Sequence, residues 1–272
     1  MTVRGSQPPG GERRVATGPA PEFIERGPLG AVLLEASPVS LDDGQQRQLA
    51  RYRDLLLGWN ERINLTAVTE PADVETWLLL DALLMAPAIA DFALKLKHRP
   101  SLIDIGAGGG LPGIPLAIAM PGIDFTLVDA TGKKVMVLNE MIADLGLANA
   151  RAVHGRAEEL GQNREHRGRY DIATARAVAS LPALVELTLP LLKRGGRGFF
   201  PKSSTIDDEL REGEAAAEIV GGHINGTIAL SPGVDGRVTQ LVLLVKMNET
   251  PNRFPRRAGL PSREPLGREK RA

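Results

Sequence analysis

One short segment, residues 104–113 (DIGAGGGLPG), constrains the fold of this chain more than any other feature. It follows an apolar run at 102–105 that we predict to be a strand, and it precedes a helix that we expect to hold Pro112 in its first turn. Closely spaced glycines let a backbone adopt positive φ and approach a ligand. Because ligands of open α/β sheets bind at the carboxyl ends of the strands, the segment predicts a binding loop on an α/β fold.

The rest of the chain supports an α/β fold class, because short apolar runs alternate with helical patterns from residue 101 onward. This alternation predicts a doubly wound, mostly parallel sheet with an antiparallel hairpin at its edge, preceded by N-terminal helices. The expected strands are 102–105, 124–129, 151–153, 170–174, 196–200, 224–230 and 238–245. The expected helices of this part are 133–145, 181–192 and 207–219.

Composition divides the chain into four parts. Residues 1–38 are rich in Gly, Pro and Arg, and we expect a disordered extension there. Residues 39–98 form a helical segment, with one helix starting after an N-cap at Ser40 and another from Asp73 to Lys97. Residues 99–246 carry the binding loop and form the main domain, and 247–272 form a basic C-terminal tail.

Several chemistries are excluded or disfavoured by composition. The chain has no cysteine, which excludes disulfides, thiolate metal sites and cysteine nucleophiles, and its four histidines are far apart, so we expect no metal. Acidic and basic residues balance at 33 each, so any affinity for nucleic acid must be local. Proline and glycine at 8–11 break a would-be signal sequence, and charged residues and proline interrupt the apolar run 77–96; we expect no membrane span and a cytoplasmic protein.

The spacing of the loop favours S-adenosylmethionine (SAM) as the ligand. The pattern D-x-G-x-G-x-G is typical of SAM sites, whereas a dinucleotide pattern, counted from the strand end, would need a glycine at Leu111. An acid ends the second strand, where ribose hydroxyls are held, and an Ala-Glu pair follows the third strand, where an adenine edge would lie. The alternative is a connection with helix-capping acids and no ligand. The predicted cofactor residues are Asp104, Gly106, Gly108, Gly110, Leu111, Asp129, Ala157 and Glu158.

The methyl acceptor is narrowed by what the chain lacks. Methylation of cytosine C5 needs a cysteine nucleophile. Methylation of exocyclic amines usually uses an Asp/Asn-Pro-Pro-aromatic loop after the fourth strand, where this chain has TARA at 174–177. Acceptors with an exposed lone pair remain, and guanine N7 is one that needs no general base. Arg176 is a candidate contact to a guanine edge or to the cofactor carboxylate, with a salt bridge at the strand end as the alternative.

With these motifs in place, residues 41–266 resemble the bacterial small-subunit rRNA guanine-N7 methyltransferases of the RsmG (GidB) family. The resemblance implies a Rossmann-like class I SAM-dependent methyltransferase fold and methyl transfer to N7 of a guanine in the 530 loop of 16S rRNA, with S-adenosylhomocysteine as product. It also implies that Gly106, Leu111, Ala157, Glu158 and Arg176 line the SAM site, with Arg176 as the catalytic candidate. The segments that carry it are 58–60 (GWN), 64–67 (NLTA), 104–115 (DIGAGGGLPGIP), 127–129 (LVD), 132–134 (GKK), 156–159 (RAEE), 175–181 (ARAVASL) and 254–259 (FPRRAG).

Three positions depart from the family pattern. Trp77-Leu78 stand where the family has Arg-His, Ala82 replaces a serine, and 201–203 (PKS) replaces Leu-Lys-Gly. We expect Trp59 and Trp77 to be core residues. The expected partner is 16S rRNA in the small ribosomal subunit, bound by a monomer; a SAM enzyme acting on another RNA, a protein or a small molecule is the alternative, as is an NAD-binding or non-catalytic module. The predicted RNA contacts are Lys133, Lys134, Lys202, Arg256 and Arg257.

Overall fold

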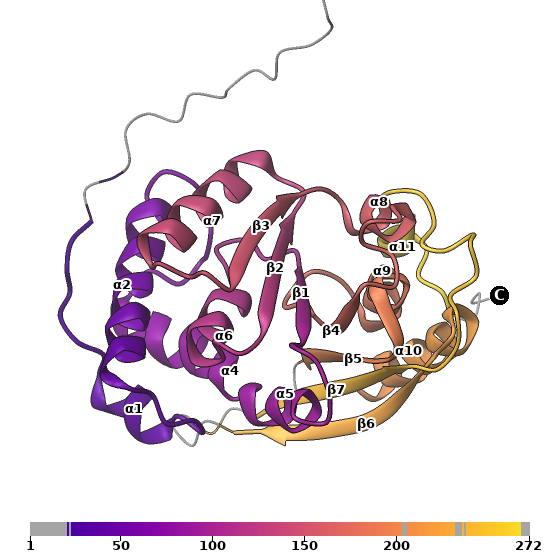
Figure 1. Cartoon of the computed structure of the whole chain (residues 1–272), viewed down its shortest axis with the longest axis horizontal. Coiled ribbons are helices and arrows are strands. Elements are labelled where there is room, and N and C mark those ends of the chain that lie inside the picture. Colours follow the sequence, from indigo (N-terminus) through magenta and orange to yellow (C-terminus); the bar gives the residue numbers. More distant parts are fainter. Residues whose placement is uncertain (1–20, 22, 203–205, 232–235, 237, 268–272) are drawn as a thin grey trace, which may run out of the picture.

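A seven-stranded sheet runs through the computed structural model, which describes residues 21, 23–202, 206–231, 236 and 238–267 (Figure 1). Its strand order is β3-β2-β1-β4-β5-β7-β6; β1 to β5 are parallel, and β7 is antiparallel to both of its neighbours. The predicted α/β class and the antiparallel edge hairpin are confirmed. The strands are β1 (Ser101–Ile105), β2 (Asp124–Asp129), β3 (Ala150–His154), β4 (Tyr170–Thr174), β5 (Leu192–Lys202), β6 (Gly222–Leu230) and β7 (Thr239–Lys246).

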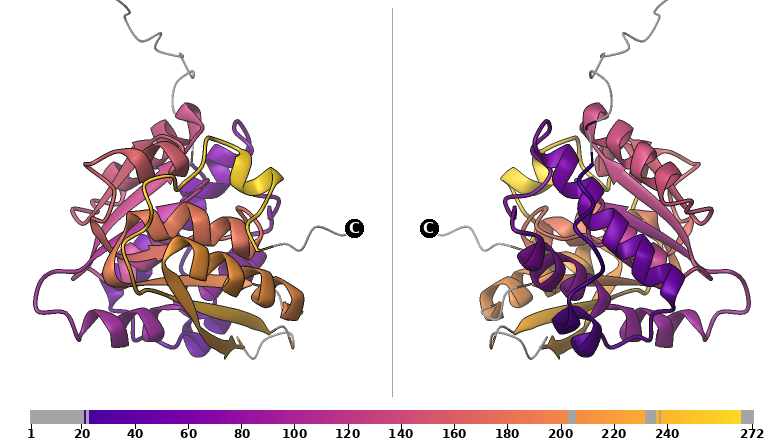
Figure 2. Two further views of the ribbon diagram at one scale, coloured as in Figure 1. Left: turned by 90° about the vertical axis from the view of Figure 1, so that its right-hand side faces the viewer. Right: turned by 90° about the vertical axis from the view of Figure 1, so that its left-hand side faces the viewer.

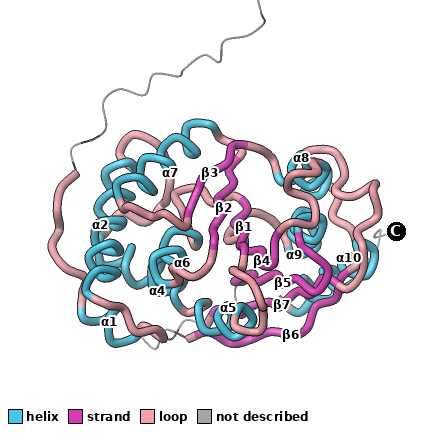
Figure 3. Tube along the Cα trace, in the orientation of Figure 1, coloured by secondary structure: helices cyan, strands magenta, loops and turns pink. Residues whose placement is uncertain are grey.

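Helices cover both faces of the sheet (Figure 3). Alternate strand residues point to opposite faces, so Leu102 joins one apolar cluster while Ile103 and Ile105 join the other. The first cluster is completed by α2 (Asp43–Asn60), α4 (Leu80–Leu83), α5 (Ala86–Ala93), α6 (Gly113–Ala119) and α7 (Gly132–Asp144). The second is completed by α8 (Ala157–Gln162), α9 (Leu181–Thr188) and α10 (Asp207–Val220).

The N-terminal part is more ordered than its composition predicts. The expectation of disorder is wrong for residues 31–36, which form α1 (Ala31–Ala36); residues 1–20 lie outside the described part of the chain. The segment before α1 lies along α2 (Figure 2, right), held by the buried Arg53, which donates to the carbonyls of Gly27 and Pro28 and pairs with Glu75. A buried guanidinium needs such partners, and here the extended segment provides them.

The first long helix starts two residues later than predicted. Asp42, not Ser40, is its N-cap, because the Asp42 carboxylate accepts from the Gln45 amide and the Gln45 side chain accepts from the Asp42 amide. This reciprocal capping box satisfies two backbone donors at once. The helix ends at Asn60.

The predicted second helix is divided. Its pieces are α3 (Pro71–Asp73), the π-helical turn η1 (Val74–Leu79), α4 and α5, and Pro87 lies in the first turn of α5, where a missing N–H is tolerated. By length and composition Pro71–Ala93 could cross a membrane, but 56% of its most apolar window is buried inside the protein. Leu79, Leu83 and Ile89 are fully buried, so this segment is part of the core.

Two of the smaller differences involve proline. Pro112 is the N-cap of α6 rather than a residue of its first turn, and α9 gives way at Thr188 to a 3-10 turn, η2 (Leu189–Leu191), that contains Pro190. The helix α8 was not predicted. The hairpin turn was expected at 231–236, most of which lies outside the described residues.

Candidate functional site

The loop between β1 and α6 has the backbone that its glycines predict. Gly106, Gly108 and Gly110 have φ values of +70°, +57° and +101°, which residues with a Cβ rarely adopt. At Gly106 space is also limiting, because a Cβ there would lie 2.5 Å from Cγ2 of Val178. The loop therefore presents bare backbone at the carboxyl end of β1.

The Asp104 side chain anchors this loop through a hydrogen bond. Its side chain is fully buried, and Oδ2 accepts a hydrogen bond of 3.0 Å from the Gly113 amide. Burial raises the pKa of Asp104 to about 8, against the opposing effects of the Gly113 hydrogen bond and the Arg176 charge. Oδ1 is also buried and accepts no hydrogen bond within the described part of the chain. An acceptor of this kind suits a ligand that brings donors or positive charge.

Asp129, at the end of β2, also anchors the loop through hydrogen bonds. Oδ2 accepts from the Gly108 amide at 3.0 Å and Oδ1 from the Thr131 amide at 2.8 Å. A carboxylate has about four acceptor positions, so two bonds leave capacity for ribose hydroxyls. Asp129 lines a pocket of about 160 Å³ together with Gly106, Ala157 and Glu158. The structure thus gathers residues from three strand ends that the sequence predicted as one cofactor site.

The N-terminal segment supports the loop from the other side. The Tyr52 hydroxyl donates to the Gly109 carbonyl at 2.8 Å. The Asn60 side chain accepts from the amides of Leu65 and Thr66, which brings Leu65 against Gly109. The two N-terminal motifs, GWN and NLTA, therefore shape the rear of the glycine-rich loop.

Arg176 lies at the end of β4, beside the same edge of the sheet. Its Nη1 is 4.0 Å from Oδ2 of Asp81, which belongs to α4, and about four-fifths of both side chains is buried. The next residue, Ala177, has φ +55°, a conformation unusual for alanine. Asp81 was not singled out from the sequence, since only the folded chain brings α4 to this strand end.

The predicted RNA contacts do not gather at one place. Lys133 is exposed and Lys134 half-buried at the start of α7, and Arg257 is exposed. Lys202 is mostly buried and donates to Glu209 at 2.8 Å and to the Ala179 carbonyl. The Arg256 side chain is bound to Glu186. Two of the five predicted contacts therefore have partners within the protein.

Two residues that line the pocket, Gly259 and Ser262, were missed in the sequence. The Gly259 amide donates a hydrogen bond of 2.7 Å to Glu158, which the sequence did predict. Sequence reasoning assigned this segment to a tail that binds RNA, because no local pattern connects it to Glu158. Trp77, expected in the core, is 42% exposed, whereas Trp59 is buried as predicted.

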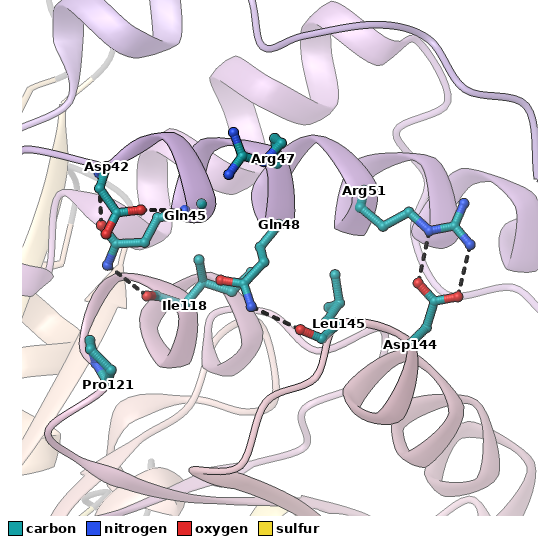
Figure 4. Close-up of a pocket in the computed structure, with 10 residues that line it drawn as sticks. Asp42, Gln45, Arg47, Gln48, Arg51, Ile118, Pro121, Asp144 and Leu145 are labelled. Carbon is teal, nitrogen blue, oxygen red and sulfur yellow. Dashed lines mark hydrogen bonds and ion pairs between the residues drawn. The ribbon is translucent and has the colours of Figure 1, made fainter.

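A larger cavity of about 550 Å³ lies away from the strand ends, between α2 and the C-terminal ends of α6 and α7 (Figure 4). Its polar side chains serve the packing of these helices. Gln45 donates to the Ile118 carbonyl, Gln48 to the Leu145 carbonyl, and Arg51 pairs with Asp144 (Figure 4). The glycine-rich loop and its acids remain the better candidate site.

The sheet order with an antiparallel β7 and the glycine-rich loop after β1 define a class I methyltransferase. The family described as GidB, rRNA small subunit methyltransferase G, matches residues 45–229. The chain belongs to this family, which confirms the resemblance found in the sequence, and it is an rRNA methyltransferase.

The chain is also similar to individual proteins. A ribosomal RNA small subunit methyltransferase G from Alkaliphilus oremlandii is 39% identical over 228 residues, covering 84% of this chain and 93% of the relative. Its counterpart from Leuconostoc mesenteroides subsp. mesenteroides is 43% identical over 235 residues, covering 86% and 96%. The crystal structure of an rRNA methylase from Streptococcus thermophilus is 18% identical, with a TM-score of 0.43 over 60% of this chain and 95% of that one.

Proposed function

We propose that this enzyme transfers a methyl group from SAM to N7 of a guanine in the 530 loop of 16S rRNA. The observation that carries the cofactor is the buried Asp104 beneath a loop of bare backbone, with one carboxylate oxygen that has no protein donor. SAM has a sulfonium and an ammonium group at its methionine end. A buried carboxylate oxygen that lacks a donor therefore fits this cofactor.

Each end of the cofactor has residues of suitable chemistry. When bound, SAM supplies an electrophilic methyl group. Asp129 accepts hydrogen bonds from the ribose hydroxyls, and Ala157 and Glu158 hold the adenine. The loop residues Gly106, Gly108, Gly110 and Leu111 hold the methionine part, together with Asp104.

The segment after β4 supports guanine N7 as the acceptor. Guanine N7 carries a lone pair and no proton, so the enzyme needs to orient the base rather than deprotonate it. The segment after β4 supplies Arg176, whose planar guanidinium suits the O6 and N7 edge of guanine. Asp81, 4.0 Å away, limits the positions of that side chain. Arg176 thereby orients the acceptor or the cofactor carboxylate, and proximity does most of the catalysis.

RNA binding rests on the exposed basic residues. Lys133, Lys134 and Arg257 are free to contact phosphates of the small subunit, and electrostatic contacts of this kind provide most non-specific affinity. Lys202 and Arg256 act by holding neighbouring segments in place. We place the enzyme in the cytoplasm as a monomer, acting on ribosomal subunits.

Mapping the modified nucleotide tests this function. Small subunits from a strain that lacks this protein are incubated with enzyme and methyl-labelled SAM, and the labelled nucleotide is located by reverse transcription and mass spectrometry. We expect one 7-methylguanine in the 530 loop, and no label on subunits from the parent strain. Label in another nucleotide, in ribosomal protein or in a metabolite would contradict the proposal.

A further inference from the structure

The segment after β7 folds back over the carboxyl edge of the sheet. Its short helix α11 (Leu260–Arg263) lies next to α8 and α9 (Figure 1). Gly259 and Ser262 line the same pocket of about 160 Å³ as Gly106 and Asp129. A basic stretch that composition assigns to solvent is therefore part of the candidate cofactor site.

Long side chains anchor the first half of this segment. Arg167 donates to the carbonyls of Thr250 and Phe254 at 2.8 and 2.7 Å. Gln162, at the end of α8, donates to the carbonyls of Asn252 and Pro255. Backbone carbonyls of an irregular segment need such donors when they leave water, so the path of the segment is specified.

Two acids anchor the second half. The side chain of Glu186 in α9 is fully buried and accepts from the backbone amide and the guanidinium of Arg256. Glu158 in the first turn of α8 accepts from the amide of Gly259, which has φ +78° and precedes α11. These contacts fix the turn that brings Ser262 to the pocket.

The size and lining of the pocket suit a flat ring system. Cavities of about 150 Å³ hold one benzene molecule, so this open pocket accommodates a ring system and not the whole of SAM. Val128, Ala157 and Leu187 provide apolar surface, while Glu158 and Ser262 provide polar groups. A purine base has apolar faces and polar edges, which match this lining.

We propose that Gly259 and Ser262 form a wall of the SAM site and that Ser262 contacts the adenosine part of the cofactor. The inference rests on the proposed function, since it takes the adenosine of SAM as the occupant of the pocket. Two consequences follow. First, a large side chain at position 262 competes with adenosine for the pocket. Second, bound cofactor stabilises the observed position of the segment, because a ligand that binds only one form of a protein favours that form.

Titration calorimetry with S-adenosylhomocysteine tests the wall. We expect Ser262→Phe to lower the affinity about 10- to 100-fold, because it overfills the pocket. Ala258→Phe is the matched control: Ala258 is exposed in the same segment and does not line the pocket, so its affinity should equal that of the wild type. Wild-type affinity in Ser262→Phe would overturn the proposal that Ser262 is part of the SAM site.

Hydrogen exchange of the unmodified protein provides a second test that does not depend on how the variants fold. We expect S-adenosylhomocysteine to slow amide exchange across residues 255–263, including the Gly259 amide that Glu158 accepts. Unchanged exchange there, with slowed exchange in the glycine-rich loop, would overturn the proposal that this segment forms a wall of the SAM site, while leaving the proposed cofactor in place. A wild-type protein that binds no S-adenosylhomocysteine would overturn the proposed function itself.

Discussion

Arg256 forms a two-pronged ion pair with Glu186: its Nε lies 2.9 Å from Oε1 and its Nη2 lies 2.7 Å from Oε2. The Glu186 side chain is fully buried in α9, and the Arg256 side chain is 22% exposed. The pair connects two segments that are 70 residues apart in the sequence. It explains why a basic C-terminal segment takes a defined path instead of extending into solvent.

The ion pair predicts a large effect on stability. Arg256→Ala leaves the Glu186 carboxylate buried without its cation, and we expect a loss of about 3–5 kcal/mol in the free energy of unfolding. Urea denaturation measures this loss. Arg257→Ala, which removes an exposed neighbour of the same charge, should change stability by less than about 0.5 kcal/mol. Equal stabilities of the two variants would show that the pair contributes nothing.

A second prediction concerns the glycine-rich loop. In Gly106→Val, a β-branched residue would have to adopt φ +70°, and its side chain would collide with Val178. We therefore expect S-adenosylhomocysteine binding to be lost, while the far-UV circular dichroism spectrum stays that of the wild type. Gly122→Ala is the control, because Gly122 has open space around it and no positive φ. Retained affinity in Gly106→Val would contradict the loop assignment.

A third prediction follows from the raised pKa of Asp104. With a pKa of about 8, the group holds a proton at pH 7 in the free enzyme, and a cationic cofactor favours the ionised form. Binding then releases a proton below pH 8, and affinity for SAM rises as pH approaches 8. Calorimetry in buffers of different ionisation enthalpy counts the protons. Asp104→Asn should abolish the release; a release that persists in this variant assigns it to another group.

A fourth prediction concerns RNA. Each phosphate contact contributes about 0.7–0.9 to the slope of log affinity against log salt. Lys133→Ala with Lys134→Ala should therefore weaken binding to small subunits and make that slope shallower by up to about 2. Arg99→Ala is the control, because Arg99 precedes β1 at the opposite edge of the sheet and pairs with Asp124. An unchanged slope in the double variant would remove these lysines from the interface.

Much of the fold could be predicted because its signals are local. Apolar runs of strand length bracket the helical patterns of 133–145 and 207–219, and closely spaced glycines mark the loop after β1, where the backbone needs positive φ. The three acids predicted to bind the cofactor could be aligned with three strand ends for the same reason. Asp42 could also have been found as the N-cap, because Gln45 follows at the spacing of a capping box.

What the sequence could not predict depends on contacts between distant segments. The order of residues 23–36 depends on the buried Arg53, and the wall at Gly259 and Ser262 depends on Glu158 and Glu186. Local composition gives such segments the character of solvated tails. The partner residues are charged, and nothing in their local sequence indicates that they bind these segments.

Equilibrium binding of nucleosides by the wild-type enzyme tests the central claim most directly. S-adenosylhomocysteine and NADH are each titrated into the protein in a calorimeter under the same conditions. The structure predicts one S-adenosylhomocysteine per chain and no heat of binding from NADH. Saturable binding of NADH, with none of S-adenosylhomocysteine, would contradict the account.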